Sequence, residues 1–269
     1  MGKTISIFNQ KGGVGKTTTC VNLAASLGAK GKSVLLVDVD PQGNSTSGVG
    51  ADKAEIEYST YDILINKVPA RGIMIETEFK NLFLLPANMN LAGAELELAD
   101  QEDRFYALKK AISPLALDFD YIIIDNSPFK SYLTTCAMCA SNKIITPICV
   151  DNFSYDGLMS LFDTIEDLNA KYALSIEFAG MFMTRVAGRT TLYKQMFESY
   201  ENMFGDKFLP VSIRNCIAVN ESNTLFEPLL TYDKRSTAAQ DYIELVNYLG
   251  LMDNKHYREL AKYLKGEKK

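Results

Sequence analysis

The sequence predicts an α/β fold in which a doubly wound, mostly parallel sheet carries helices on both faces. Short, nearly continuous apolar runs recur along the chain, which is typical of strands buried on both faces of a parallel sheet. Helical patterns alternate with these runs. A length of 269 residues with 47% hydrophobic content is enough to enclose a large core. The apolar runs are 5–8, 34–37, 82–85, 121–124, 144–148 and 176–182.

The elements follow in order from the N-terminus. The first apolar run leads into a glycine-rich stretch, and the helix that begins there has an apolar face formed by Cys20, Leu23, Ala24 and Leu27. Residues 42–80 are the least regular part, where we expect surface loops and short helices. A late helix has a similar face, formed by Ala239, Ile243, Val246 and Leu249. We therefore expect a single domain over residues 1–269 that ends in a basic segment at 251–269.

Composition argues against several classes of protein. The net charge of −5 predicts no general attraction to nucleic acid, so any DNA contact needs a local basic patch. No run of 18 apolar residues exists, and the N-terminus lacks a basic region before a long apolar one, so neither a membrane span nor a secretory signal is expected. An odd number of cysteines, most of them in apolar stretches, indicates free thiols in a reducing cytoplasm. These are Cys20, Cys136, Cys139, Cys149 and Cys216.

The stretch from Asn9 to Thr19 resembles a phosphate-binding loop of the pattern G-x-x-x-x-G-K-[ST]. It lies between an apolar strand and a helix, which is the context that such a loop requires. A glycine-rich turn without a ligand is the alternative interpretation. The stretch departs from the pattern twice, because Gln10 replaces the first glycine and Lys11 adds a second lysine inside the loop.

The residue types in this loop fit phosphate chemistry. Gly12, Gly13 and Gly15 carry no Cβ, so the backbone can approach a ligand closely and point its N–H groups at phosphate oxygens. The N-terminus of the following helix adds a positive potential. We expect Lys16 to reach the β- and γ-phosphates and the Thr17 hydroxyl to bind Mg²⁺.

Aspartates follow two of the predicted strands. Asp125 ends the run YIIID, which fits a Walker-B acid that holds Mg²⁺, although an aspartate that only begins a turn is the alternative. Asp38 and Asp40 lie two residues apart after another strand, so they tend to project from the same side at the carboxyl edge of the sheet. Asp38 would then support the Mg²⁺ site and Asp40 would position an attacking water. Because Asp40-Pro41 is also typical turn chemistry, one of these two acids need not be catalytic.

Three motifs together resemble the ParA/Soj family of partitioning ATPases, which are P-loop NTPases with a deviant Walker A motif, related to MinD. They are KGGVGKTTT at 11–19, VLLVDVDPQGN at 34–44 and YIIID at 121–125, and the similarity covers nearly all of residues 1–250. The resemblance implies that ATP and Mg²⁺ bind at the loop, with Val14 and Thr18 among the contacts. It implies that Lys11 crosses the face of an ATP-bound homodimer to the partner's phosphates, and that Asp40 is the hydrolytic aspartate.

The resemblance also implies a cellular role. It predicts slow ATP hydrolysis stimulated by a ParB-type centromere-binding protein, and non-specific DNA binding by the ATP dimer on the nucleoid. Members with an N-terminal helix-turn-helix domain carry a long extension before the loop. Because the loop begins ten residues into this chain, no such domain is expected.

This chain matches the family's sequence pattern at some positions and departs from it at others. The family usually reads D-x-P-P after Walker B, whereas this chain has Asp125-Asn126-Ser127-Pro128, which leaves the local turn open. The adenine pocket of relatives involves strand ends that match FMTR and FLPVS here. On that basis we expect Thr184 and Pro210 to contact the base.

Basic residues suggest where an acidic protein would touch DNA. The family's basic positions correspond to Arg189 and Arg214, and Lys234, Arg235 and the C-terminal basic residues are further candidates. Solvated surface charge is the alternative for each. The tail also carries an apolar stripe, so it is a packed last helix, a DNA contact or, least favoured, a MinD-type membrane helix. The stripe consists of Tyr257, Leu260, Ala261 and Leu264.

The C-x-x-C pair Cys136 and Cys139 is weighed as a metal or cluster ligand pair. Two thiols at helical spacing supply only half of a metal site, so buried helix cysteines are the favoured interpretation. The alternative is an electron-transfer ATPase that resembles the nitrogenase iron protein. His256 is the only histidine, which excludes a histidine-dependent triad elsewhere.

Overall fold

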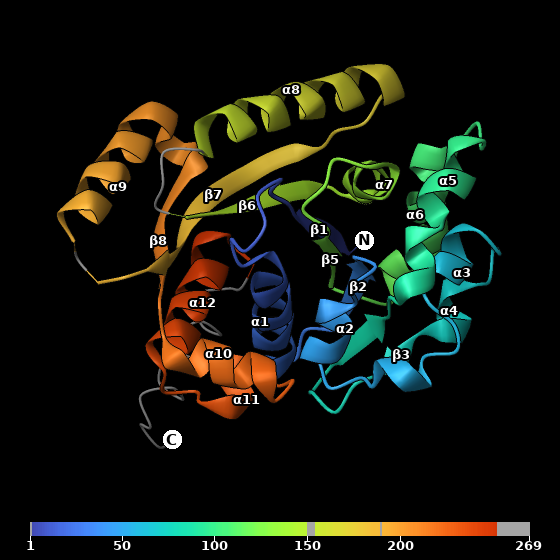
Figure 1. The fold of residues 1–269 in the computed structure, drawn as a ribbon, viewed down its shortest axis with the longest axis horizontal. Coiled ribbons are helices and arrows are strands. Elements are labelled where there is room, and N and C mark those ends of the chain that lie inside the picture. The colour runs from blue at the N-terminus through green and yellow to red at the C-terminus, as the bar shows by residue number, and fades with distance from the viewer. Residues whose placement is uncertain (1, 150–153, 189, 252–269) are drawn as a thin grey trace.

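The computed structural model describes residues 2–149, 154–188 and 190–251, and an eight-stranded sheet forms the centre of this part (Figure 1). The strand order is β3-β4-β2-β5-β1-β6-β7-β8. Neighbouring strands are parallel, except that β3 runs antiparallel to β4 at one edge. The strands are β1 (Lys3–Ile7), β2 (Val34–Val39), β3 (Ile75–Glu76), β4 (Leu82–Leu85), β5 (Tyr121–Asn126), β6 (Lys143–Cys149), β7 (Glu177–Val186) and β8 (Phe208–Arg214).

Helices cover both faces of the sheet, which confirms the predicted doubly wound architecture (Figure 1). One face packs against α1 (Lys16–Ala29), α10 (Ile217–Thr224), α11 (Leu229–Tyr232) and α12 (Thr237–Tyr248). The other face packs against α3 (Thr60–Leu64), α4 (Ala70–Ile73), α5 (Ala94–Ala99), α6 (Ala107–Ile112), α7 (Tyr132–Ala140), α8 (Ser154–Tyr172) and α9 (Thr191–Phe204). The short helix α2 (Asn44–Gly48) lies beside α1.

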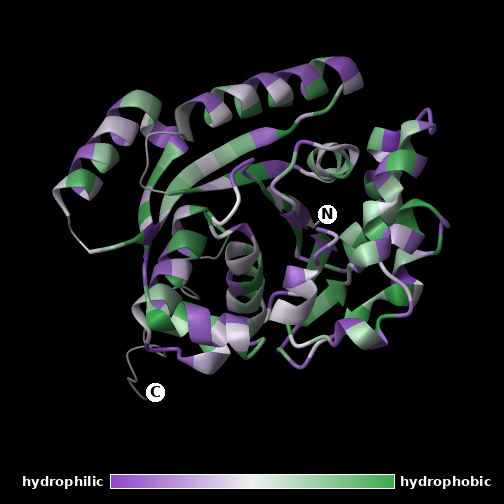
Figure 2. Cartoon of the chain, viewed as in Figure 1, coloured by the Kyte–Doolittle hydropathy of each residue, from purple (hydrophilic) through white to green (hydrophobic). Residues whose placement is uncertain are grey.

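Alternation along the strands explains why both faces are apolar. In β2, Val34 and Leu36 belong to the core beneath α1, whereas Leu35 and Val37 belong to the core on the opposite face. Successive side chains of a strand point to opposite faces, so a continuous apolar run fills both cores at once. The covering helices alternate between hydrophobic and hydrophilic residues, as Figure 2 shows for α8 and α9.

Strand register brings the sequence motifs to one edge of the sheet. β5 lies between β1 and β2, and Asp125 is level with Ile7 on one neighbour and with Asp38 on the other. The glycine loop begins two residues after Ile7. Because all three strands are parallel, the loop and both aspartates meet at the carboxyl edge, where open α/β sheets bind ligands.

The structure adds elements that sequence patterns did not predict. The two-residue strand β3 is new, and β8 was indicated only by the match of FLPVS to a strand end of relatives. Residues 42–80 contain α2, α3, α4 and β3, in line with the expected irregular segment. At the opposite, amino edge of the sheet, the Tyr121 hydroxyl donates a hydrogen bond of 2.7 Å to the carbonyl of Leu251. The rest of the predicted basic segment at 251–269 lies outside the described residues.

Candidate nucleotide site

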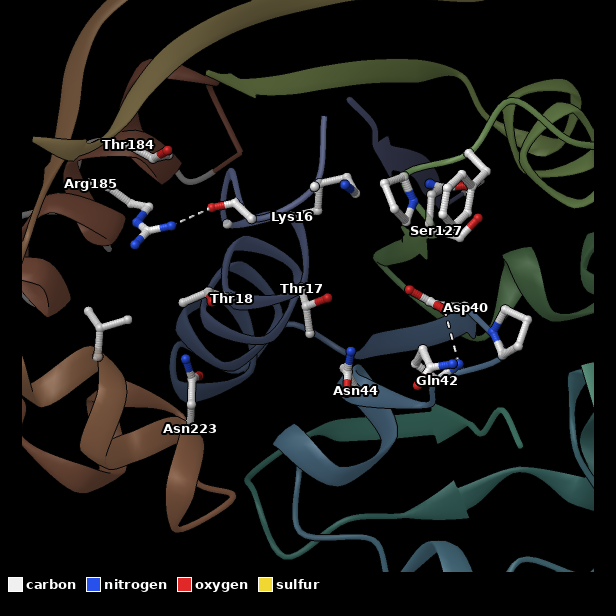
Figure 3. A pocket seen from close by; sticks show the side chains of 18 of the residues that line it. Lys16, Thr17, Thr18, Asp40, Gln42, Asn44, Ser127, Thr184, Arg185 and Asn223 are labelled. Carbon is white, nitrogen blue, oxygen red and sulfur yellow. Dashed lines mark hydrogen bonds between the residues drawn. The ribbon is translucent and has the colours of Figure 1, made fainter. Parts of the chain in front are cut away.

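A cavity of about 1110 Å³ opens at the carboxyl edge of the sheet (Figure 3). Its walls come from segments that follow β1, β2, β4 and β5, from the carboxyl ends of β7 and β8, and from α10 and α12, which are far apart in the sequence. The lining includes Gly12, Gly13, Gly15, Lys16, Thr17, Thr18, Asp40, Asn126, Ser127, Thr184, Arg185, Ile213, Arg214, Asn215, Asn220, Asn223 and Tyr242. The fold thus gathers the predicted phosphate loop and the predicted catalytic aspartate in one cavity.

The glycine loop has the backbone conformation that close approach to a ligand requires. Gly13 and Gly15 adopt positive φ angles of 72° and 89°, in the left-handed region that favours glycine. Gly15 is the N-cap of α1 and no side chain caps this end of the helix. The first N–H groups of α1 therefore keep their hydrogen-bonding capacity for a ligand at this end.

The two lysines of the loop occupy different environments. Lys16 is only 7% exposed, and its ammonium donates a 3.0 Å hydrogen bond to the carbonyl of Lys11. Burial lowers the pKa of Lys16, and the charges of Asp125 and Asp40 oppose that shift. The Lys11 side chain is exposed at the mouth of the loop, and its backbone N–H donates to Asn9 Oδ1 at 2.9 Å. Lys16 therefore lines the cavity of its own chain, whereas Lys11 is exposed and is not among the residues that line the cavity.

Asp125 is fully buried behind the first turn of α1. It accepts a 2.6 Å hydrogen bond from the Ser45 hydroxyl, a further one from the Thr17 hydroxyl, and a weaker 3.4 Å contact from the Cys20 thiol. Burial raises the pKa of Asp125, and the hydrogen bonds from Ser45 and Thr17 counteract the shift. Thr17 and Asp125, each expected to bind Mg²⁺, are therefore in direct contact.

Asp38 takes a more internal position than the sequence suggested. Its Oδ2 accepts hydrogen bonds of 2.8 Å from both the N–H and the hydroxyl of Thr46, and its Oδ1 accepts one from the N–H of Asp40 at 3.0 Å. Burial, followed by the negative charge of Asp125, raises the pKa of Asp38 to about 7. Asp38 does not line the cavity, whereas Asp40 does. The two acids lie at the same edge of the sheet but at different depths, because β2 ends at Val39 and the chain turns at Asp40.

Asp40 both forms a turn and lines the cavity, which are the two roles that its sequence context left open. Its Oδ1 accepts the N–H of Gln42 at 3.0 Å and its carbonyl accepts the N–H of Gly43 at 2.8 Å, which is turn chemistry. The side chain also lines the cavity, opposite Lys16 and Thr17 in Figure 3. The turn therefore fixes the carboxylate while leaving it accessible from the cavity.

The oxygen atoms gathered here suit a magnesium ion. Mg²⁺ prefers hard oxygen ligands and is usually held in nucleotide sites by one or two protein side chains together with substrate phosphates. The Thr17 hydroxyl and the Asp125 carboxylate already contact one another, and the charge of Asp125 raises the pKa of Asp38 on the neighbouring strand. No cluster of three or more His, Cys, Asp or Glu residues that suits a metal occurs among the described residues. A site completed by phosphate oxygens is the arrangement that these residues fit.

Comparison with known proteins now identifies the family. The AAA domain family matches residues 2–178. The sporulation initiation inhibitor protein Soj of Bacillus subtilis is 40% identical over 91% of this chain and 97% of its own length. The chromosome-partitioning ATPase Soj of Treponema pallidum is 34% identical over 94% of this chain and 99% of its own. The chain belongs to the ParA/Soj family of partitioning ATPases.

A solved relative adds information on ligands. Cobyrinic acid a,c-diamide synthase from Mycobacterium smegmatis, crystallised with an ATP analog and magnesium, is 31% identical, with a TM-score of 0.76 over 84% of this chain and 93% of its own. The prediction of an ATPase that uses ATP and Mg²⁺ is thereby confirmed at the level of the family. As a ParA/Soj member, this chain carries the deviant loop on a standard P-loop scaffold.

Only one of the two residues that we expected to contact the adenine base lines the cavity. Thr184 lines the cavity, but Pro210 is exposed and does not. β8 continues to Arg214, so its carboxyl end lies four residues beyond Pro210. The residues that reach the cavity from this direction include Asn215 and Tyr242, which the sequence reading did not single out. The asparagine-rich stretch after β8 was the available signal.

The basic residues that we expected to contact DNA differ in their surroundings. Arg214 lines the nucleotide cavity, and its guanidinium pairs with the buried Asp241, with Nε–Oδ2 at 2.9 Å and Nη2–Oδ1 at 2.5 Å. This pairing raises the pKa of Arg214. Arg189 lies outside the described residues. Arg235 is exposed and Lys234 half-buried at the turn before α12, so both lie at the surface.

Over the residues described, no helix has the length and apolar character to cross a membrane.

The cysteine pair is part of the core. Cys136 and Cys139 lie in α7 and are both buried, and the Cys136 thiol donates to the carbonyl of Arg104 at 2.9 Å. Burial raises their pKa values to about 12 and about 11. Both thiols are buried in the core, and two thiols on one helix supply only half of a metal site. The favoured interpretation of buried helix cysteines is confirmed, and the pair gives no support to an electron-transfer ATPase.

Proposed function

We propose that this protein is an ATP-dependent dimeric switch that partitions DNA. The observation that carries the proposal is the contrast between the two lysines of the loop. Lys16 is enclosed within the cavity of its own chain, whereas Lys11 is exposed at the mouth of the same loop. A nucleotide held by one chain therefore presents its phosphates beside a cationic side chain that is positioned to serve a second chain.

Each residue of the cavity has a part in this proposal. Lys16 leaves the Lys11 carbonyl for the β- and γ-phosphates, and the loop N–H groups hold the remaining phosphate oxygens. Thr17 and Asp125 hold Mg²⁺, with Asp38 behind them. Mg²⁺ supplies positive charge that neutralises the phosphates during transfer. Asp40, fixed by its turn, aligns a water with the γ-phosphate.

Nucleotide and dimer are coupled through Lys11. A ligand shifts an equilibrium only by its differential affinity for the two states, and only the dimer offers a second lysine to the phosphates. ATP therefore favours the dimer, and hydrolysis removes the contact that stabilises it. We further propose that the dimer binds DNA non-specifically on the nucleoid, and that a ParB-type centromere-binding protein stimulates its slow hydrolysis.

The test compares Lys11→Ala with a matched change of an exposed lysine distant from the cavity, Lys80→Ala. Removing Lys11 is expected to weaken nucleotide-dependent dimerisation by about 100-fold, because it removes one partner of a desolvated charge contact. The affinity of the monomer for ATP should change far less. Light scattering with a slowly hydrolysed ATP analog measures the dimer, and a fluorescent nucleotide measures binding. A Lys11→Ala protein that dimerises as well as the Lys80→Ala protein contradicts the proposal.

DNA binding requires a separate measurement. Retention of the protein on non-specific duplex DNA is measured with ATP or ADP at two salt concentrations. The proposal predicts ATP-dependent retention that falls steeply with salt, because phosphate contacts release counterions. Retention on anionic liposomes instead of DNA would favour a MinD-type membrane role.

A further inference from the structure

Two consecutive residues at the end of β7 hold two consecutive carbonyls of the glycine loop. The Thr184 hydroxyl donates to the carbonyl of Val14 at 2.7 Å. Arg185 Nη1 donates to the carbonyl of Gly13 at 3.0 Å, the bond drawn as a dashed line from Arg185 in Figure 3. The two segments are far apart in the sequence, since the bonded residues are separated by 170 and 172 positions. The end of β7 thus holds two carbonyls of the glycine loop by hydrogen bonds.

Holding a carbonyl also fixes the N–H group of the same peptide. A peptide unit is planar and trans, so its C=O and N–H point in opposite directions. Fixing the carbonyls of Gly13 and Val14 toward β7 therefore directs the N–H groups of Val14 and Gly15 away from β7. These are donors of the loop that a phosphate group would use, and a fixed direction removes the entropy cost of ordering them on binding.

The backbone of Arg185 shows that this arrangement is built into the strand end. Arg185 has a φ of 56°, in the left-handed region that residues other than glycine rarely adopt. Such a conformation persists only where the surroundings determine it, and it occurs preferentially at functional sites. Thr184 is 2% exposed, and its hydroxyl, which has one proton, lies between the carbonyl of Val14 and that of Ile148 at 3.1 Å, so packing and this position fix its rotamer.

We propose that Thr184 and Arg185 form a clamp that preorganises the glycine loop for the phosphates of a nucleoside di- or triphosphate. The clamp rests on the proposed function, since it acts on the same site. It assigns Thr184 to positioning the loop instead of contacting the base. Arg185 lines the cavity as well, so its charge lies on the phosphate side and adds to the attraction. Both are positioning residues, because they act through the N–H groups of the loop.

The experiment measures nucleotide dissociation constants with a fluorescent ADP, together with kcat and KM for ATP. Thr184→Val removes the hydroxyl with little change of shape, and Thr184→Ser keeps it. The clamp predicts that Thr184→Val raises the dissociation constant about tenfold and that Thr184→Ser restores most of the affinity. If valine and serine bind alike, the hydroxyl does not position the loop and the clamp is wrong.

Arg185→Gly supplies the second measurement. Glycine relieves the left-handed conformation while adding chain entropy to the unfolded state, so the melting temperature without nucleotide should move by less than about 2 °C. The KM for ATP should rise about five- to tenfold with kcat within about twofold, a split that a general loss of structure does not produce. An unchanged KM contradicts the clamp.

Lys16→Ala separates failure of the clamp from failure of the proposed function. Should Lys16→Ala abolish nucleotide binding while the two β7 variants bind normally, the site is correct and the clamp is wrong. Should Lys16→Ala also bind normally, both proposals fall.

Discussion

The buried pair of Asp38 and Asp125 makes stability depend on pH in an unusual direction. The two carboxylates lie level on adjacent strands and are both inaccessible to water. Burial and the charge of Asp125 raise the pKa of Asp38 to about 7, from the 3.8 of an ordinary aspartate. The folded protein therefore keeps a proton on this site over a pH range in which the unfolded chain has lost it.

The size of the effect follows from linkage. Where the folded state binds more protons than the unfolded state, the free energy of unfolding falls as the pH rises. Each pH unit is worth about 1.4 kcal/mol for one proton, and the interval from 3.8 to about 7 spans about three units. The proton held by the Asp38–Asp125 pair should thus lower the free energy of unfolding by roughly 4 kcal/mol between pH 4 and pH 7. Below 3.8 there is no such loss, and above 7 it is complete.

The assay is urea denaturation from pH 4 to pH 7.5 in EDTA without nucleotide, for the wild type and Asp38→Asn. Asparagine cannot ionise, so the difference in unfolding free energy between the two proteins should change by about 4 kcal/mol over this range, with the wild type losing stability as the pH rises. Asp118→Asn, at an exposed position, serves as the control and should show no comparable trend. A flat difference curve for Asp38→Asn, or one that rises with pH, refutes the reasoning.

Further predictions concern single residues. Asp40→Ala should lower ATP turnover about 100-fold or more while nucleotide still binds; a phosphate-release assay measures this, and undiminished turnover would remove Asp40 from its role. Gly28→Ala should cost about 2 kcal/mol in urea denaturation, because the new Cβ would lie 2.4 Å from the carbonyl of Lys80; a variant as stable as the wild type contradicts this packing. Asp241→Asn should cost about 1–2 kcal/mol, a value reduced because Arg214 is half exposed, and an unchanged melting temperature would show that the pair adds no stability.

Patterns along the chain predicted the centre of the sheet well and its edge poorly. The strand β5 reads as an uninterrupted apolar run because both of its faces are buried. β8 was not among the apolar runs because its buried and exposed residues alternate: Pro210 and Arg214 are exposed and Ser212 is half-buried. β8 is an edge strand, where such exposure and a missing proline N–H are tolerated. A proline alone does not decide the matter, since Pro147 lies in the central strand β6, which the apolar run at 144–148 predicted.

The sequence likewise predicted some residues of the candidate site and not others. Glycines, lysines and strand-end acids were found because each is required locally, by the turn or by the phosphates. Arg185 was not found, since its significance lies in a left-handed backbone and a contact with Gly13, 172 residues away. The different depths of Asp38 and Asp40 were equally invisible, because they depend on where β2 ends. Contacts between distant segments and the exact end of a strand are tertiary properties.

The hydrogen bond from Tyr121 to Leu251 has a practical consequence for labelling. Tyr121 is the first residue of β5, so Leu251 is fixed at the edge of the sheet opposite the cavity. The end of the described chain therefore lies on the side remote from Lys11 and Asp40. Labels at this edge of the sheet should leave nucleotide exchange intact, whereas labels at the glycine loop would block it.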